Sequence, residues 1–147
     1  MLILTINTVT AISFLRKALL PGIFILAAVS CGAQSFSGFG GTIKDDASRN
    51  QFTVTVSGLA SSIDTNFGLF GVTVNINHSF VGDLNLFLIS PDNTLIELST
   101  GNGGSGKNYT NCLFTNSSSN KITTGIPPFK GNHKPEGSLG VMNNKQQ

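Results

Sequence analysis

VNINHSFVGDLNLFLISPDNTLIELS, residues 74–99, carries the strongest secondary-structure signals in the chain. Its first part continues an alternation of apolar and polar residues that begins earlier, so one β-strand is expected over 67–80. Because side chains of a strand point alternately to its two faces, Val74, Ile76 and His78 are expected on one face. This alternation predicts that His78 faces inward together with the two aliphatic residues.

The remainder of this stretch predicts a turn and a pair of antiparallel strands. Val-Gly-Asp at 81–83 is expected to be a turn, and LNLFLIS at 84–90 is apolar enough to be buried on both sides. Ser-Pro-Asp-Asn-Thr at 90–94 is strong turn chemistry, so 95–99 should return as the partner strand. An alternating segment at 51–58 predicts a further half-buried strand, and CLFT at 112–115 is expected to be a short strand.

The whole composition agrees with an all-β domain. The chain has 147 residues, of which 11% are charged and 17 are glycine. No segment after residue 33 shows a sustained helical period, whereas short strands and turn signals recur. Such a pattern favours a β-sandwich over a barrel.

The N-terminal segment 1–33 has the features of an export signal with an N-terminal extension. Arg16-Lys17 is followed by twelve mainly apolar residues, 18–29, and then by small residues. This run is short for a membrane-spanning helix, so no membrane span is expected. Two processing routes are open: cleavage after Ala33, or lipidation of Cys31 as in a bacterial lipoprotein. Both predict a secreted or cell-surface protein.

Charge and cysteine content exclude several classes of protein. The net charge is +2, but from residue 34 onward seven Lys and Arg balance seven Asp and Glu. This balance gives no indication of a nucleic-acid partner or an anionic membrane surface. After Ala33 the only cysteine is Cys112, which we expect to be a small core residue because one thiol supports neither a disulfide framework nor a thiolate zinc site.

The order of motifs after the export signal resembles the P/Homo B domain. This β-sandwich domain follows the catalytic domain of subtilisin-like proprotein convertases such as kexin and furin, and it also occurs in bacterial secreted proteins. The resemblance covers about residues 40–139. Its most specific elements are His78 with Gly82-Asp83-Leu84, the turn Leu88-Ile89-Ser90-Pro91, Phe114, Pro128-Phe129-x-Gly131, Pro135-Glu136 and Leu139.

The resemblance implies a jelly-roll-like (galactose-binding-domain-like) β-sandwich over 34–147. The family pattern continues with a Gly-x-Trp-x-Leu segment and a final strand, neither of which appears here, so we expect the last strands to be missing. Asn93 stands where the family turn commonly has glycine. Because asparagine tolerates a positive φ angle, the turn is expected to form.

Two readings of the polar motif residues remain open at this stage. In the first, the residues are architectural, with His78 and Asp83 forming a structural hydrogen-bonded pair. In the second, carboxylates gathered from several loops bind Ca²⁺, which prefers six to eight oxygen ligands. The architectural set is His78, Gly82, Asp83, Pro91, Phe129, Gly131, Pro135 and Glu136, and the calcium set is Asp45, Asp46, Asp83 and Asp92.

The sequence contains no recognisable catalytic triad of a subtilisin-like protease. The surroundings of Asp64 lack the expected glycine, and both histidines after residue 33 lie in motifs of the P/Homo B domain. The resemblance therefore implies a non-catalytic domain that packs on and stabilises a subtilisin-like serine endopeptidase, in cis or in trans. An adhesion or carbohydrate-binding module of a bacterial surface protein is the alternative, although a chain with no Trp and one Tyr is poor in sugar-stacking residues.

Overall fold

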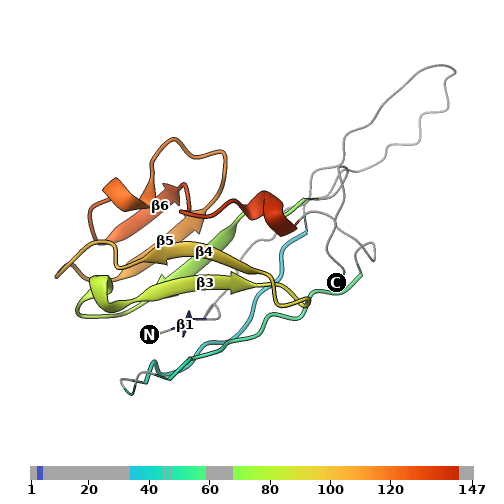
Figure 1. Ribbon diagram of the computed structural model, residues 1–147, viewed down its shortest axis with the longest axis horizontal. Coiled ribbons are helices and arrows are strands. Elements are labelled where there is room, and N and C mark those ends of the chain that lie inside the picture. Colours follow the sequence, from blue (N-terminus) through green and yellow to red (C-terminus); the bar gives the residue numbers. More distant parts are fainter. Residues whose placement is uncertain (1–2, 5–33, 45, 47, 59–67, 143–147) are drawn as a thin grey trace, which may run out of the picture.

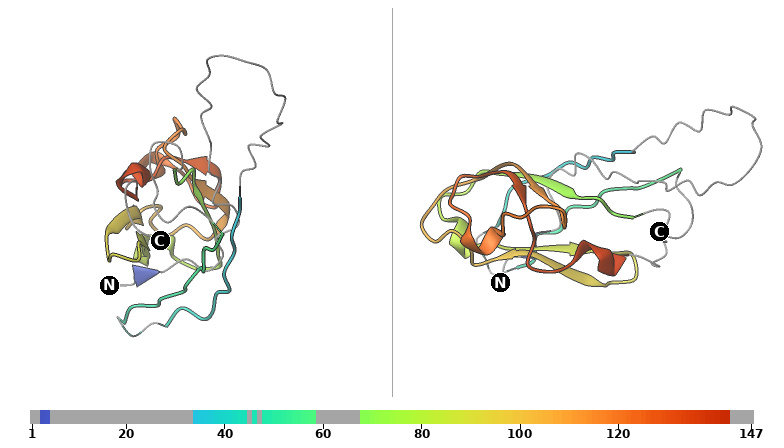
Figure 2. Two further views of the ribbon diagram at one scale, coloured as in Figure 1. Left: turned by 90° about the vertical axis from the view of Figure 1, so that its right-hand side faces the viewer. Right: turned by 90° about the horizontal axis from the view of Figure 1, so that it is seen from above.

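The computed structural model describes residues 3–4, 34–44, 46, 48–58 and 68–142. The described chain forms two three-stranded sheets that face each other, as Figures 1 and 2 show from three directions. Its only helical elements within these residues are three short 3₁₀ turns, which confirms the all-β prediction. The finer jelly-roll topology stays a prediction.

The first sheet has the strand order β1-β3-β4. Strand β3 (Asn85–Ile89) pairs antiparallel with β4 (Leu95–Thr100), as the sequence predicted. The short strand β1 (Ile3–Leu4) lies in parallel on the other edge of β3. The predicted export signal and the two processing sites fall almost entirely on 5–33, which lie outside the described residues, so both stay predictions.

The second sheet has the strand order β2-β5-β6. Strand β2 (Val72–Ile76) pairs antiparallel with β5 (Tyr109–Phe114), and β5 pairs in parallel with β6 (Phe129–His133). Strand β2 is shorter than the predicted 67–80, and β5 begins three residues before the predicted strand at 112–115. The 3₁₀ turns are η1 (Val81–Asp83), η2 (Ile122–Thr124) and η3 (Leu139–Met142).

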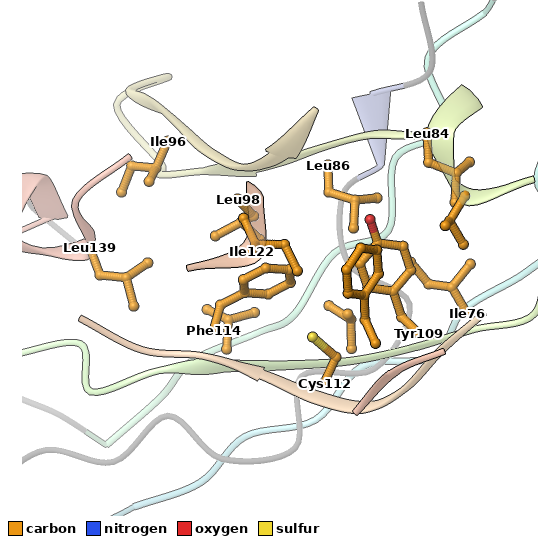
Figure 3. Close-up of a cluster of buried hydrophobic side chains, with 14 of the residues drawn as sticks. Ile76, Leu84, Leu86, Ile96, Leu98, Tyr109, Cys112, Phe114, Ile122 and Leu139 are labelled. Carbon is orange, nitrogen blue, oxygen red and sulfur yellow. The ribbon is translucent and has the colours of Figure 1, made fainter. Parts of the chain in front are cut away.

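The hydrophobic core lies between the two sheets. Figure 3 shows side chains from β3 and β4 pointing toward those of β2 and β5. Cys112 is fully buried among them, as expected, and burial raises the pKa of its thiol to about 12. The other fully or almost fully buried apolar residues are Val72, Val74, Ile76, Val81, Leu84, Leu86, Ile96, Leu98, Tyr109, Phe114, Ile122, Phe129 and Leu139.

Residues 34–44 and 48–58 run side by side as an extended arm along the sandwich (Figures 1 and 2). Phe52, Val54 and Val56 are half-buried while the residues between them are exposed, so the predicted alternation is confirmed. The predicted strand at 51–58 is not assigned as one. Phe52 and Val54 pack against the core, which explains why the alternation is present without a regular ladder.

Candidate functional site

Four of the eight motif residues contact the β4–β5 loop, residues 101–108. It contains four glycines, and three of them adopt a positive φ angle: Gly101, Gly103 and Gly104. Glycine reaches this conformation without the steric cost that other residues incur. The loop can therefore fold back tightly enough to be contacted by segments from three other parts of the chain.

Gly82 in η1 provides the first of these contacts. Its backbone N–H donates to the carbonyl oxygen of Gly104 at 3.0 Å, and the neighbouring Val81 N–H donates to the Gly106 oxygen at 2.9 Å. A Cβ atom added at Gly82 would lie 2.8 Å from that Gly104 oxygen. Close approach of two backbones thus accounts for glycine in the Gly-Asp-Leu motif.

His78 provides the second contact, through its backbone and not through its ring. Its N–H donates to Asn108 Oδ1 at 2.9 Å, and its carbonyl oxygen accepts from the Asn108 N–H at 3.2 Å. Asn108 in turn accepts a bond from the Phe129 N–H at 3.1 Å, so it joins β2 to β6. Two of the motif residues, His78 and Phe129, are connected through this single asparagine.

His78 is half-buried between the exposed residues Asn77 and Ser79, so the predicted alternation extends to it, but its ring has a partner other than the predicted Asp83. Strand β2 ends at Ile76, and the His78 side chain is only half-buried. Its Nδ1 lies 2.8 Å from the carbonyl oxygen of Phe80 and 3.2 Å from the Phe80 nitrogen, so the ring closes a local turn and not a pair with Asp83.

Glu136 provides the third contact. Its Oε1 accepts from the backbone N–H of Thr100 at 2.7 Å and from Asn102 Nδ2 at 2.6 Å. Asn102 also donates to Ser99 Oγ, which lies 3.0 Å from the hydroxyl of Tyr109. This chain of hydrogen bonds runs from the exposed carboxylate to the buried phenol at the start of β5.

Tyr109 is the buried end of that chain. Burial raises the pKa of its phenol to about 12, against the lowering effect of the bond to Ser99. Its ring centroid lies 4.8 Å from that of Phe129, and the two rings fill the core beneath the loop. The phenol therefore remains protonated at neutral pH and acts as a hydrogen-bonding group of the core.

The other architectural residues lie apart from this loop or act in different ways. Pro91 is exposed in the β3–β4 turn at the opposite end of β4, and Asp83 is exposed in η1. Gly131 has φ +76° at a shift in the β5–β6 register. Pro135 is buried directly before Glu136 and helps to fix the direction of that segment.

The three described aspartates of the calcium prediction, Asp46, Asp83 and Asp92, do not form a group of metal ligands. Asp46 is exposed, and its bonds with Ser48 lower the pKa of its carboxyl group. Asp92 is exposed in the β3–β4 turn and accepts from Ser90 Oγ and from the Thr94 N–H. Within the described part of the chain no three His, Cys, Asp or Glu residues group as metal ligands, and Asp45 lies outside it. The four-residue calcium site stays a prediction.

One buried polar group was not anticipated from the sequence. His133 is 9% exposed, and neither of its ring nitrogens has a hydrogen-bond partner. Its ring packs edge-on against Phe129, with centroids 5.7 Å apart. In the sequence, the one indication that His133 is buried is its spacing from Phe129, which places both residues on the inward side of β6. A buried imidazole without hydrogen-bond partners is a cost to stability, and no carboxylate orients it as a catalytic base would require.

The fold and the loop contacts define a β-sandwich whose motif residues serve as structural braces. Residues 68–125 match the family model of the proprotein convertase P-domain, which confirms the resemblance to that family over this region. P-domains are the non-catalytic domains of these proteases. The matched segment contains β2 to β5 and therefore the whole β4–β5 loop. No curated protein and no solved structure matches this chain.

The described helices can be compared with the length that a membrane span requires. Among the residues that the structure describes, no helix is long and apolar enough to cross a bilayer.

Proposed function

We propose that this chain is an exported, non-catalytic P-domain that packs on and stabilises a subtilisin-like serine endopeptidase domain, in cis or in trans. The match to the proprotein convertase P-domain over 68–125 is the observation that carries the proposal. The braced β4–β5 loop supports it, because a pre-formed loop offers a partner a surface that needs little ordering on binding.

The environments of the two described histidines support a non-catalytic role. A serine protease needs a histidine that accepts a proton from the serine and is oriented by a carboxylate. The ring of His78 is engaged with the backbone of Phe80, and that of His133 is buried without a partner. We therefore expect the purified chain to cleave no peptide after paired basic residues. Cleavage that persists through purification and disappears on substitution of one Ser or His would contradict this.

A thermal inactivation experiment tests the stabilising role. A subtilisin-like catalytic domain lacking its own P-domain is heated alone, with the full chain added in equimolar amount, and as a fusion with the full chain. We expect the half-life of peptidase activity to increase severalfold in the fusion. The control is a fusion carrying Gly103→Ala, which disturbs the β4–β5 loop. It should prolong the half-life less than the unchanged fusion does. If neither addition nor fusion changes the half-life, the proposal fails.

The alternative of a carbohydrate-binding module that stacks sugars on aromatic rings receives less support. The single tyrosine, Tyr109, is 1% exposed and lies in the core, so it is unavailable to a ligand. Within the described part of the chain, the exposed aromatic residues are Phe39, Phe70 and Phe80, which lie on separate segments.

A further inference from the structure

The lysines of the second sheet and its connections concentrate positive charge in one part of the chain. Residues 98–135 contain four lysines and no Asp or Glu. Strand β6 alternates inward Phe129 and His133 with exposed Lys130 and Asn132, and Lys134 follows in the same exposed register. The balanced charge of residues 34–147 as a whole conceals this local concentration of positive charge.

Lys121 and Lys134 are held next to each other by the backbone. They form a parallel bridge, in which the Ile122 N–H donates to the Lys134 oxygen at 3.0 Å and the Lys134 N–H donates to the Asn120 oxygen at 2.6 Å. Like charges at neighbouring positions of adjacent strands are destabilising. Both residues border one hollow of about 310 Å³, which is further lined by Thr123, Pro135 and Glu136.

The hollow has the chemistry of an anion site. Two ammonium groups and the hydroxyl of Thr123 supply hydrogen-bond donors. Glu136 is the one acidic residue on its border, and its Oε1 already accepts bonds from Thr100 and Asn102. A bound anion would relieve the repulsion between Lys121 and Lys134, which gives the pair a physical reason to bind one.

We propose that this surface, the lysine face (Lys121, Thr123, Lys130, Asn132 and Lys134), binds a linear anionic polysaccharide. Lys130 and Lys134 are separated by about 13 Å along an extended strand. This spacing suits successive charged groups of an extended chain better than one compact anion. The proposal does not depend on docking to a protease domain.

Other classes of partner fit this face less well. None of its five residues is aromatic or an arginine. Protein interfaces are enriched in aromatic residues and arginine and depleted in lysine. Proteins that hold single-stranded nucleic acids use aromatic side chains on which the bases stack. A polysaccharide that carries carboxylate, sulfate or phosphate groups requires only the charges and hydrogen-bond donors that are present.

Binding of the full chain to heparin, a sulfated polysaccharide, tests the proposal, with neutral dextran as the uncharged control. The variant Lys121→Gln/Lys134→Gln should bind heparin about tenfold or more weakly, since each lysine near an anionic surface contributes severalfold in affinity. The matched control, Lys44→Gln/Arg49→Gln, removes the same charge from the exposed arm and should bind nearly as the unchanged chain does. Binding should weaken as salt is added.

Several results would overturn the proposal. One is an equal loss of heparin affinity in the two double variants, and another is equal binding to dextran and heparin. Tighter binding to polyglutamate would assign the face to an acidic polypeptide instead, and tighter binding to single-stranded DNA would assign it to nucleic acid. Far-UV circular dichroism of each variant shows that a loss of binding is not a loss of fold.

Discussion

The two ends of β4 are connected to the rest of the molecule in opposite ways. At its start, the β3–β4 turn (90–94) is closed by bonds among its own residues, such as Asn93 N–H to the Ser90 oxygen at 2.9 Å. At its end, the β4–β5 loop (101–108) is held by His78, Gly82 and Glu136, each more than 20 positions away in sequence. The first end is determined by local chemistry and the second by tertiary packing.

This difference predicts that substitutions in the loop cost much more stability than substitutions in the turn. A local turn that weakens loses bonds within five residues. A loop that serves as a shared contact loses its bonds to several segments together. The following predictions test this contrast, beginning with the largest expected effect.

Gly103→Ala should destabilise the protein by roughly 3 kcal/mol, because it combines backbone strain with overpacking. Gly103 has φ +85°, and an added Cβ would lie 2.6 Å from Pro127 and 2.8 Å from Val81. The adjacent Gly104→Ala is the control: its φ is +51°, and nothing lies within 4 Å of its added Cβ. It should cost only about 1–2 kcal/mol. Urea unfolding of both variants measures the difference, and equal losses would refute the packing argument.

Alkaline pH should weaken the core beneath the loop. The ordinary pKa values of 9.0 for Cys112 and 10.0 for Tyr109 are raised to about 12 in the folded protein, mainly by burial. The unfolded chain therefore binds fewer protons than the folded chain above about pH 9, so stability that is complete below this pH falls toward pH 12. Urea melts from about pH 8 to about pH 11 measure the decline.

The variant Cys112→Ala serves as a control for the alkaline effect. It removes one of the two titrating groups, so its stability should decline less steeply with pH than that of the unchanged chain. If both proteins show the same slope, ionisation of the thiol does not contribute.

Glu136→Ala should reduce the free energy of unfolding by about 2 kcal/mol, the scale of hydrogen bonds to a charged acceptor. Its carboxylate accepts from the Thr100 N–H and from the Asn102 side chain. Asp92→Ala makes the same chemical change in the β3–β4 turn and should cost about half as much or less. A larger loss for Asp92→Ala in denaturant melts would reverse the proposed contrast.

His133→Leu should raise the free energy of unfolding by about 1 kcal/mol, since it removes two buried nitrogens that lack partners. His78→Leu is the comparison: it deletes the ring that bonds to the Phe80 backbone and should give no gain. Thermal melts at neutral pH distinguish the two. A loss of stability in His133→Leu would mean that the imidazole is satisfied in solution, for example by water.

The contrast between local and tertiary contacts also explains which features could be predicted from the sequence. The strands β3 and β4, the positive φ of Asn93 and the half-buried face of Phe52 and Val54 all depend on neighbouring residues, and they were predicted correctly. The partner of the His78 ring was not predicted, because the ring bonds to the backbone of Phe80 and not to Asp83.

The residues that hold the β4–β5 loop could not be assigned to it from the sequence. The family resemblance singled out Gly82 and Glu136 as motif residues, but nothing in their local sequence shows that both contact one loop. The contact of Glu136 with Asn102 spans 34 positions. Strand β5 was similarly predicted too short, because its first residues acquire strand geometry by pairing with β6 and not by alternation.

Asn93→Gly should change stability by no more than about 0.5 kcal/mol, the smallest effect of the series. Asn93 has φ +62° and an exposed side chain, so glycine satisfies the backbone equally well while adding some freedom to the unfolded chain. Asn93→Val keeps the position but introduces a β-branched residue that disfavours positive φ, and should cost about 1–2 kcal/mol. Denaturant melts of the pair separate backbone preference from side-chain contacts. If Asn93→Gly proves as damaging as Gly103→Ala, the turn depends on the asparagine side chain and is not determined by local backbone conformation alone.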